Sequence, residues 1–122
     1  MEFSRMGTGT DRPYVSAVIA EGRFVFVSGQ TPTRNGLPVE GSITEQTTAV
    51  MENIAAVLAS AGATLHEVIR CGVFLSDLTD LKDFNAAYTA AFGQHVPART
   101  TVGAALPGYK VEIDCIALLP PT

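Results

Sequence analysis

Excess positive charge and long apolar runs are both missing from this chain. Its 122 residues include 8 Lys and Arg against 12 Asp and Glu, and the basic residues are scattered singly. A chain of net charge −4 without a basic stripe has few groups that could displace phosphate counterions, so a nucleic-acid partner is not expected. No apolar run is long enough for a membrane span, and the first residues lack the apolar core of a signal peptide. We therefore expect a cytoplasmic protein with no membrane partner.

Cysteine and histidine are scarce, and neither is spaced as a metal site requires. Cys71 and Cys115 both lie in apolar, strand-like runs, which favours reduced thiols in a cytosolic core over a disulfide or a ligand role. His66 and His95 lie far apart in the sequence, without a Cys or an acid at a recognised offset. Phosphate-binding, dinucleotide-binding and serine-nucleophile motifs are also missing. We expect no metal and no cofactor.

The residues that are present describe one compact domain. Apolar residues make up 47% of the chain and charged residues 16%, which is typical of a globular protein and not of a disordered one. A length of 122 residues is enough for a single core and too short for two. Residues 1–13 are polar and aperiodic, so we expect them to form an extended N-terminal arm on a domain that covers residues 1–122.

Periodicity predicts two helices. Ser42 and Glu45 fit a capping box, apolar residues then recur at helical spacing, and Gly62 is placed to end the helix. A second apolar stripe runs from about Asp80 to Phe92 and is closed by Gly93. Strand-like runs occupy residues 14–20, 23–27, 68–75, 100–104 and 110–119. The first two are expected to pair as a hairpin across Glu21–Gly22, and residues 31–41 to form a loop.

The predicted order of elements is therefore ββαβαββ. This order indicates an α+β domain in which both helices pack on one face of the sheet. The chain offers no third helix to cover the other face, so we expect that copies of the chain associate into a closed homo-oligomer.

The last strand and Arg99 carry the most chemical information. Alternation along residues 111–117 places Glu112 and Asp114 on one face of the strand, together with large aliphatic residues. One interpretation is an edge strand charged against aggregation; the other is a functional carboxylate whose pKa is raised at the margin of an apolar layer. Arg99 could be a surface or ion-pair residue, or a bidentate clamp for a substrate carboxylate that Glu112 faces across a cleft. Tyr14, Ser28 and Asn85 are more typical of structural positions when each is considered alone.

Five segments in the same order resemble the RidA/YjgF family of reactive-intermediate deaminases. The resemblance extends from Arg12 to Ala117 and is carried by Pro13-Tyr14, Phe26-Val27-Ser28-Gly29-Gln30, Asp83-Phe84-Asn85-Ala86-Ala87-Tyr88, Pro97-Ala98-Arg99-Thr100-Thr101 and Val111-Glu112-Ile113-Asp114. It implies a chorismate-mutase-like fold and a homotrimer, in which the sheets form an inner barrel and three clefts lie between neighbouring subunits.

The same resemblance implies an activity and a site. Family members hydrolyse enamines and imines, such as 2-aminoacrylate, 2-iminopropanoate and 2-iminobutanoate, to 2-keto acids and ammonia without a cofactor. Arg99 would clamp the substrate carboxylate, and Glu112 would position water and move protons. The remaining substrate-binding positions would be Tyr14, Ser28, Gly29, Asn85 and Thr101.

Three departures from the family pattern leave other activities open. Thr101 replaces a common cysteine, Arg12 replaces the glycine before Pro-Tyr, and the segment from Arg99 to Glu112 is shorter than is typical. An enzyme with the same site could act on a different enamine acid, of the 3-aminoacrylate or 2-aminomuconate type. A trimer that binds small carboxylates without turnover is a second alternative. The endoribonuclease activity often attached to the family fits this acidic chain least.

Overall fold

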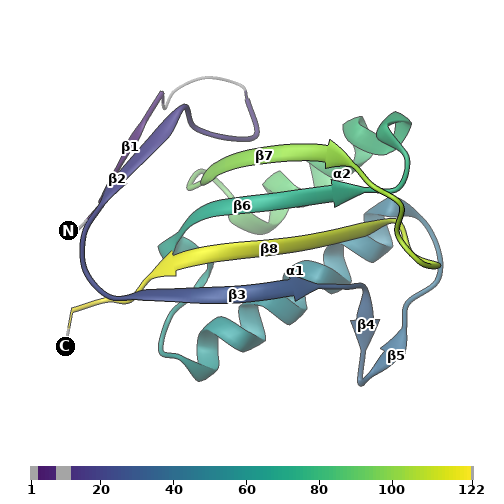
Figure 1. The fold of residues 1–122 in the computed structure, drawn as a ribbon, viewed down its shortest axis with the longest axis horizontal. Helices are drawn as coiled ribbons and strands as arrows, with labels where there is room; N and C mark the ends of the chain where they lie inside the picture. Colours follow the sequence, from purple (N-terminus) through teal and green to yellow (C-terminus); the bar gives the residue numbers. More distant parts are fainter. Residues whose placement is uncertain (1–2, 8–11, 122) are drawn as a thin grey trace.

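A four-stranded mixed sheet forms the centre of the molecule. The computed structural model describes residues 3–7 and 12–121, and its sheet order is β3 (Phe24–Gln30), β8 (Val111–Leu118), β6 (Val68–Leu75) and β7 (Ala98–Gly103). β8 is antiparallel to both of its neighbours, whereas β7 is parallel to β6. The helices α1 (Ile43–Ser60) and α2 (Leu81–Phe92) lie together behind the sheet (Figure 1). The predicted α+β domain with both helices on one face is confirmed.

The predicted ends of both helices are confirmed. The Ser42 hydroxyl accepts a hydrogen bond from the Glu45 amide at 3.2 Å, and the Ser42 amide donates to the Glu45 carboxylate at 3.2 Å. Gly62 and Gly93 follow the helices with φ of 87° and 69°, a left-handed conformation that costs a glycine little. Short 3₁₀ turns at Leu65–Glu67 and Leu78–Asp80 precede β6 and α2.

The core lies between the helices and the sheet. α1 contributes Val50, Ile54 and Leu58, which are completely buried. α2 contributes an aromatic row in which the ring centroids of Phe84 and Tyr88 are 5.4 Å apart and those of Tyr88 and Phe92 are 4.9 Å apart. The sheet supplies the alternate residues of β8 and β6, including both cysteines, which are free and buried. The apolar periodicity of the sequence therefore identified the faces that make this core.

β8 is a central strand, flanked by β3 and β6. Val111, Ile113, Cys115 and Ala117 are buried, while Glu112, Asp114 and Ile116 are half-buried on the other face, as the alternation predicted. The interpretation of β8 as a charged edge strand is wrong, because both of its edges are hydrogen-bonded. The two acids on this strand therefore need another explanation.

The predicted hairpin between residues 14–20 and 23–27 is not formed. β2 (Ala17–Ala20) pairs instead with β1 (Phe3–Met6), and β3 pairs with β8. The turn at residues 21–22 reverses the chain, but four-residue β2 offers seven-residue β3 a much shorter ladder than eight-residue β8. Of the predicted N-terminal arm, residues 1–2 and 8–11 lie outside the described residues.

Hydrogen bonds hold the β1–β2 pair against the domain, and a small hairpin forms within the predicted loop. The Arg5 guanidinium donates to the carbonyl oxygens of His66, Val68 and Val96 at 3.1–3.2 Å, so β1 is tied to the segments that lead into β6 and β7. Within the predicted loop, β4 (Thr33–Arg34) and β5 (Leu37–Pro38) pair across Asn35–Gly36, whose positive φ angles suit a tight hairpin turn.

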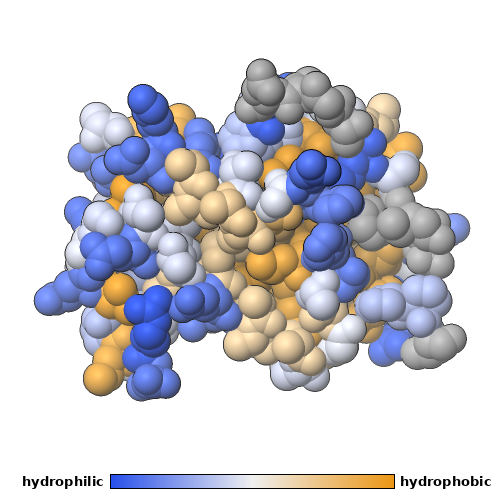
Figure 2. All heavy atoms as spheres, turned by 180° about the vertical axis from the view of Figure 1, so that it is seen from behind, coloured by the Kyte–Doolittle hydropathy of each residue, from blue (hydrophilic) through white to orange (hydrophobic). Residues whose placement is uncertain are grey.

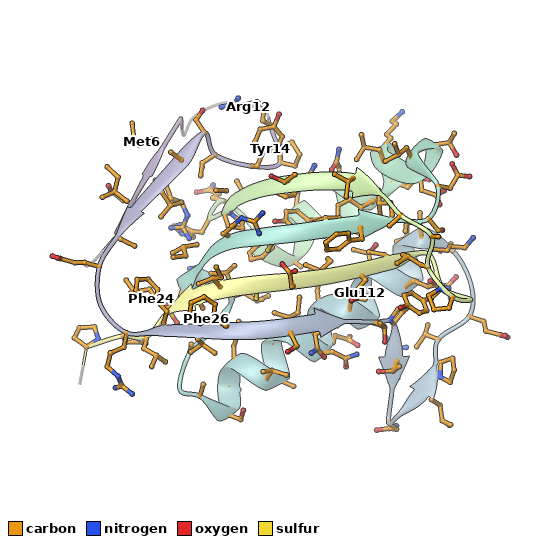
Figure 3. All side chains as sticks on the ribbon, in the orientation of Figure 1. Met6, Arg12, Tyr14, Phe24, Phe26 and Glu112 are labelled. Carbon is orange, nitrogen blue, oxygen red and sulfur yellow. The ribbon has the colours of Figure 1, made fainter. Side chains whose placement is uncertain are left out.

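The two faces of the sheet differ in what covers them. Figure 2 shows the side of the helices, where apolar residues gather in the middle of the surface. On the opposite face Phe26 is 74% exposed, and Phe24 and Val102 are also exposed. Phe24 and Phe26 lie near one end of β3 in Figure 3, beside β8. This open face is the uncovered apolar surface that the sequence predicted. Within the described part of the chain, no helix is long and apolar enough to span a membrane.

Candidate functional site

Arg99 is enclosed by aromatic rings at the edge of the sheet. It lies opposite Cys71 in the β6–β7 register, so its side chain projects from the helix-covered face. The guanidinium carbon is 5.4 Å from the ring centroid of Tyr14, 5.5 Å from that of Phe84 and 5.0 Å from that of Tyr88. These distances allow cation–π attraction, which favours the positive charge of this half-buried side chain.

The Arg99 side chain makes no hydrogen bond or ion pair to any residue that the structure describes, and its Nη1 atom is buried. Burial lowers the pKa of Arg99, but a guanidinium remains charged at neutral pH. A buried donor without a partner costs on the order of 1–3 kcal/mol, and more when it is charged. Arg99 is therefore suited to receive an anion, above all a carboxylate that can accept two parallel hydrogen bonds.

Three other predicted residues belong to the segments that surround Arg99, and we call the four the Arg99 cluster: Tyr14, Asn85, Arg99 and Thr101. Tyr14 is held there by its neighbour Val15, whose amide donates to the Pro97 carbonyl at 3.2 Å. Asn85 follows Phe84 on α2, and Thr101 shares the face of β7 with Arg99. Asn85 Oδ1 and Thr101 Oγ1 are buried without a hydrogen-bond partner among the described residues. The cluster thus combines a cation with two unused polar atoms.

The other three predicted residues, Ser28, Gly29 and Glu112, form a second group, the Glu112 cluster. The β3–β8 register shifts between Val27 and Gln30, and this irregularity contains Ser28 and Gly29, both exposed. A Cβ atom at residue 29 would collide with Glu112 Oε2, so the glycine leaves room for the carboxylate. The Tyr109 hydroxyl donates to Glu112 Oε1 at 3.0 Å. Tyr109 was missed in the sequence, where nothing but its place three residues before Glu112 points to it.

The two clusters lie on opposite faces of one sheet. Glu112 is paired with Phe74 of β6 in the register and Arg99 with Cys71, and these two β6 positions point to opposite sides. Figure 3 shows Glu112 on β8 and Tyr14 beyond the β7 edge. Within one chain, Arg99 and Glu112 therefore do not face each other across a cleft.

Asp114, the second acid of β8, is explained by local structure. Its Oδ1 accepts a hydrogen bond from the Gly72 amide at 3.1 Å and lies 3.8 Å from an Arg70 guanidinium nitrogen. A Cβ atom at residue 72 would come within 2.6 Å of this oxygen, so Gly72 leaves the room that Asp114 fills. Of the two acids on this face, Glu112 is therefore the better candidate for a role in chemistry.

A hollow of about 600 Å³ begins beside Arg99 and extends over the open face between the N-terminal segment and β6–β7. Arg12, Tyr14, Arg70, Arg99 and Thr100 are among its lining residues. The Arg12 guanidinium carbon is 5.1 Å from the Tyr14 ring centroid, on the ring that Arg99 also approaches. A small carboxylate would meet several guanidinium groups here.

The two histidines come together although their sequence spacing did not indicate it. The ring centroids of His66 and His95 are 4.7 Å apart, because the 3₁₀ turn before β6 and the loop before β7 lie side by side. Within residues 3–7 and 12–121, no group of three or more His, Cys, Asp and Glu side chains is arranged to hold a metal ion.

Comparisons with known proteins agree with the fold. A family model described as endoribonuclease L-PSP matches residues 8–119. A RutC family protein of Pyrococcus abyssi is 43% identical over 109 residues, covering 86% of this chain and 85% of its own length. The mitochondrial protein mmf2 of Schizosaccharomyces pombe is 41% identical over 110 residues, covering 86% of each chain. The structure of YyfB, a Rid family protein of Yersinia pestis, superimposes with a TM-score of 0.85 at 28% identity, covering 98% of this chain and all of the other.

Proposed function

Because the chain belongs to the RidA/YjgF family, also described as endoribonuclease L-PSP, we propose that it hydrolyses reactive imine and enamine acids to 2-keto acids and ammonia. The observation that carries this proposal is the half-buried Arg99 guanidinium, which lies among aromatic rings and has no hydrogen-bond partner among the described residues. The substrates would be 2-aminoacrylate, its tautomer 2-iminopropanoate, and 2-iminobutanoate.

The proposed reaction asks little of the protein. An imine carbon is already electrophilic, so the site needs a held carboxylate, a placed water and a route for protons. Arg99 would bind the carboxylate through its two parallel donors, with Tyr14, Asn85 and Thr101 around the rest of the substrate. Water held by Glu112 would add to the imine carbon as Glu112 takes a proton from it. Glu112 would return that proton to the nitrogen, which gives a carbinolamine. It would then take the proton of the new hydroxyl group and pass it to the nitrogen as the C–N bond breaks, so that ammonia and the 2-keto acid leave.

A complete site would form between two copies of the chain. Arg99 and Glu112 project from opposite faces of the sheet, so a single chain supplies each half of a site in a different place. A neighbour that covered the open face could bring its own Arg99 cluster toward Glu112, Ser28 and Gly29. We propose the homotrimer that the family resemblance implies. In a ring of three, each chain makes this contact with the next one, and the third contact closes the ring.

Imine lifetime tests this function directly. An amino-acid oxidase generates 2-iminobutanoate or 2-iminopropanoate, semicarbazide traps what survives, and the protein or its Arg99→Ala variant is added. Wild type should shorten the lifetime. Arg99→Ala should lose at least about 100-fold in rate, because the substrate carboxylate loses its bidentate partner and the substrate is no longer held in position. Absence of acceleration by wild type would rule out the short-chain imine substrates.

A carboxylate-binding trimer without turnover is the second candidate, and one observation favours it: the Arg99 cluster is complete within one chain, away from any catalytic acid. In that case a 2-keto acid would raise the melting temperature of the protein while imine lifetimes stayed unchanged. An enamine acid with a second charged group would also suit the hollow, which Arg12 and Arg70 line together with Arg99.

The endoribonuclease activity in the family description has less support in this chain. Its net charge is −4, and RNA binding that lasts at physiological salt requires many cationic contacts. A location in the cytoplasm stays a prediction, since the relatives include a mitochondrial protein.

A further inference from the structure

The Glu112 carboxylate has a neighbour on each side, and one of them, Tyr109, was not singled out by the family resemblance. Tyr109 donates its hydroxyl hydrogen to Oε1 at 3.0 Å, and Oε2 lies against the backbone at Gly29. Both Tyr109 and Glu112 are half-buried. A carboxylate fixed at one oxygen by a donor keeps its other oxygen for a second partner, and in the proposed reaction that partner is water.

The backbone that carries Tyr109 is itself fixed. The Lys110 amide donates to Gln46 Oε1 at 2.8 Å, and Gln46 is a buried polar residue of α1. The Lys110 carbonyl accepts a hydrogen bond from the Ser76 amide at 3.0 Å, at the end of β6. On the other side of Tyr109, Gly108 has φ of 85° and its amide donates to the Leu106 carbonyl at 3.0 Å. Tyr109 therefore sits between a closed turn and a doubly anchored residue.

The protonation state of Tyr109 suits a donor. Its hydrogen bond to Glu112 raises the pKa of Tyr109 above the usual value for a phenol, with the negative charge of Glu112 and desolvation adding in the same direction. The phenol therefore keeps its proton at neutral pH. It can donate to the ionised carboxylate throughout the range in which an imine hydrolase would work.

We propose that Tyr109 is a positioning residue that holds the Glu112 carboxylate in the orientation needed to place the attacking water. The proposal rests on the imine hydrolysis proposed above and adds a residue to it. It also gives a role to the segment between β7 and β8, whose length departs from the family pattern: this segment carries the donor that sets the carboxylate.

The test compares wild type with Tyr109→Phe, which removes the hydroxyl and keeps the ring. We expect kcat for imine hydrolysis to fall about tenfold, the effect of losing one hydrogen bond to a charged group, with KM nearly unchanged. The melting temperature and the oligomeric state should stay as in wild type.

A double variant separates positioning from a general effect on structure. If Tyr109 acts through Glu112, adding Tyr109→Phe to Glu112→Gln should cost far less than adding it to wild type. An independent readout is the phenol titration followed by phenolate absorbance: the titration attributable to Tyr109 should move to lower pH in Glu112→Gln, where the charged acceptor is gone.

The outcomes distinguish this inference from the proposed function. An active wild type with an equally active Tyr109→Phe variant would overturn the positioning role and leave the hydrolase intact. Equal losses from Tyr109→Phe in both backgrounds would also overturn it, since the effect would not pass through Glu112. An inactive wild type would remove the hydrolase proposal and this inference with it.

Discussion

The two faces of the central sheet differ in how far the chain itself covers them. On the helix-covered face, β8 and β6 contribute residues that are packed within one chain, including Cys71 and Cys115. On the open face the same strands carry Glu112, Asp114 and Arg70, beside a Phe26 side chain that is 74% exposed. Packing on the covered face accounts for the folding of the chain; for the open face we propose that another copy of the chain covers it. Alternate residues of β8 therefore have different roles. One set packs in the core, and the other set includes Glu112, which takes part in the proposed chemistry.

The strongest test of a site that is shared between copies of the chain is to mix two inactive variants. Arg99→Ala and Glu112→Gln should each lose at least 100-fold in imine hydrolysis. If sites form between copies, subunits of the two variants exchanged in equal amounts should regain about a quarter of wild-type activity, because one interface in four joins an intact Arg99 to an intact Glu112. Activity is measured after refolding the variants together, with the separately refolded variants as controls. Mixed protein no more active than the separate variants would show that the two residues do not act across an interface.

A charge on the open face should separate assembly from folding. Phe26→Asp puts a carboxylate on the most exposed large apolar residue, so a neighbour covering it would have to bury that charge. We expect the oligomer to dissociate and imine hydrolysis to fall to background, while the far-UV spectrum keeps its native shape. Light scattering gives the mass. Lys82→Asp on the outer side of α2 is a matched control that should change neither. An unchanged mass for Phe26→Asp would mean that this part of the face stays open.

The two cysteines of the covered face should make the free energy of unfolding depend on pH. Burial raises the pKa of Cys71 and of Cys115 from 9.0 to about 12, so the folded protein holds protons that the unfolded chain releases. The stability contributed by these thiols is therefore complete below about pH 9 and is lost as the pH rises toward 12, by about 1 kcal/mol per thiol at pH 10. Denaturant unfolding at pH 8 and pH 10 measures this loss. A double Cys→Ala variant should lose less over the same interval, and an equal loss would assign the effect to other groups.

The smallest expected effect concerns neither face. Ser42→Ala removes the hydroxyl that accepts from the Glu45 amide at the start of α1 and should lower the free energy of unfolding by about 1 kcal/mol. Because the cap is exposed and Ser42 belongs to neither cluster, kcat for imine hydrolysis should not change. Chemical denaturation and the imine assay on one preparation check both statements. A loss of activity without a loss of stability would indicate that the start of α1 acts on the site, by way of the hydrogen bond between Gln46 and Lys110.

Sequence reasoning succeeded where a local pattern decides the structure. The cap at Ser42, the glycines after both helices and the alternation along β8 each follow from contacts within a few residues. It failed where distant segments compete for a partner. β3 pairs with β8 and not with its neighbour in sequence, and no local signal distinguishes these outcomes, since a turn reverses the chain in either case.

The candidate site shows the same division. The family resemblance selected seven residues; in the structure three of them are grouped with Arg99 and two with Glu112. That these groups lie on opposite faces follows from the position of Arg99 on β7, which is set by its pairing with β6. Tyr109 was not found, because its contact with Glu112 depends on how a turn is anchored by Gln46 and Ser76.

The anchoring of the segment between β7 and β8 has a consequence for how such a protein can change over generations. Both ends of this segment are bonded to consecutive residues at the end of β6: the Ala104 amide donates to the Leu75 carbonyl at 2.9 Å, and the Ser76 amide donates to the Lys110 carbonyl at 3.0 Å. β6 also lies between β7 and β8 and pairs with each separately. Insertions and deletions between residues 104 and 110 can therefore accumulate without shifting the strand positions of Arg99 or Glu112. Changes in the length of this segment are a route by which descendants could acquire new ligands while they keep Arg99 and Glu112 in place.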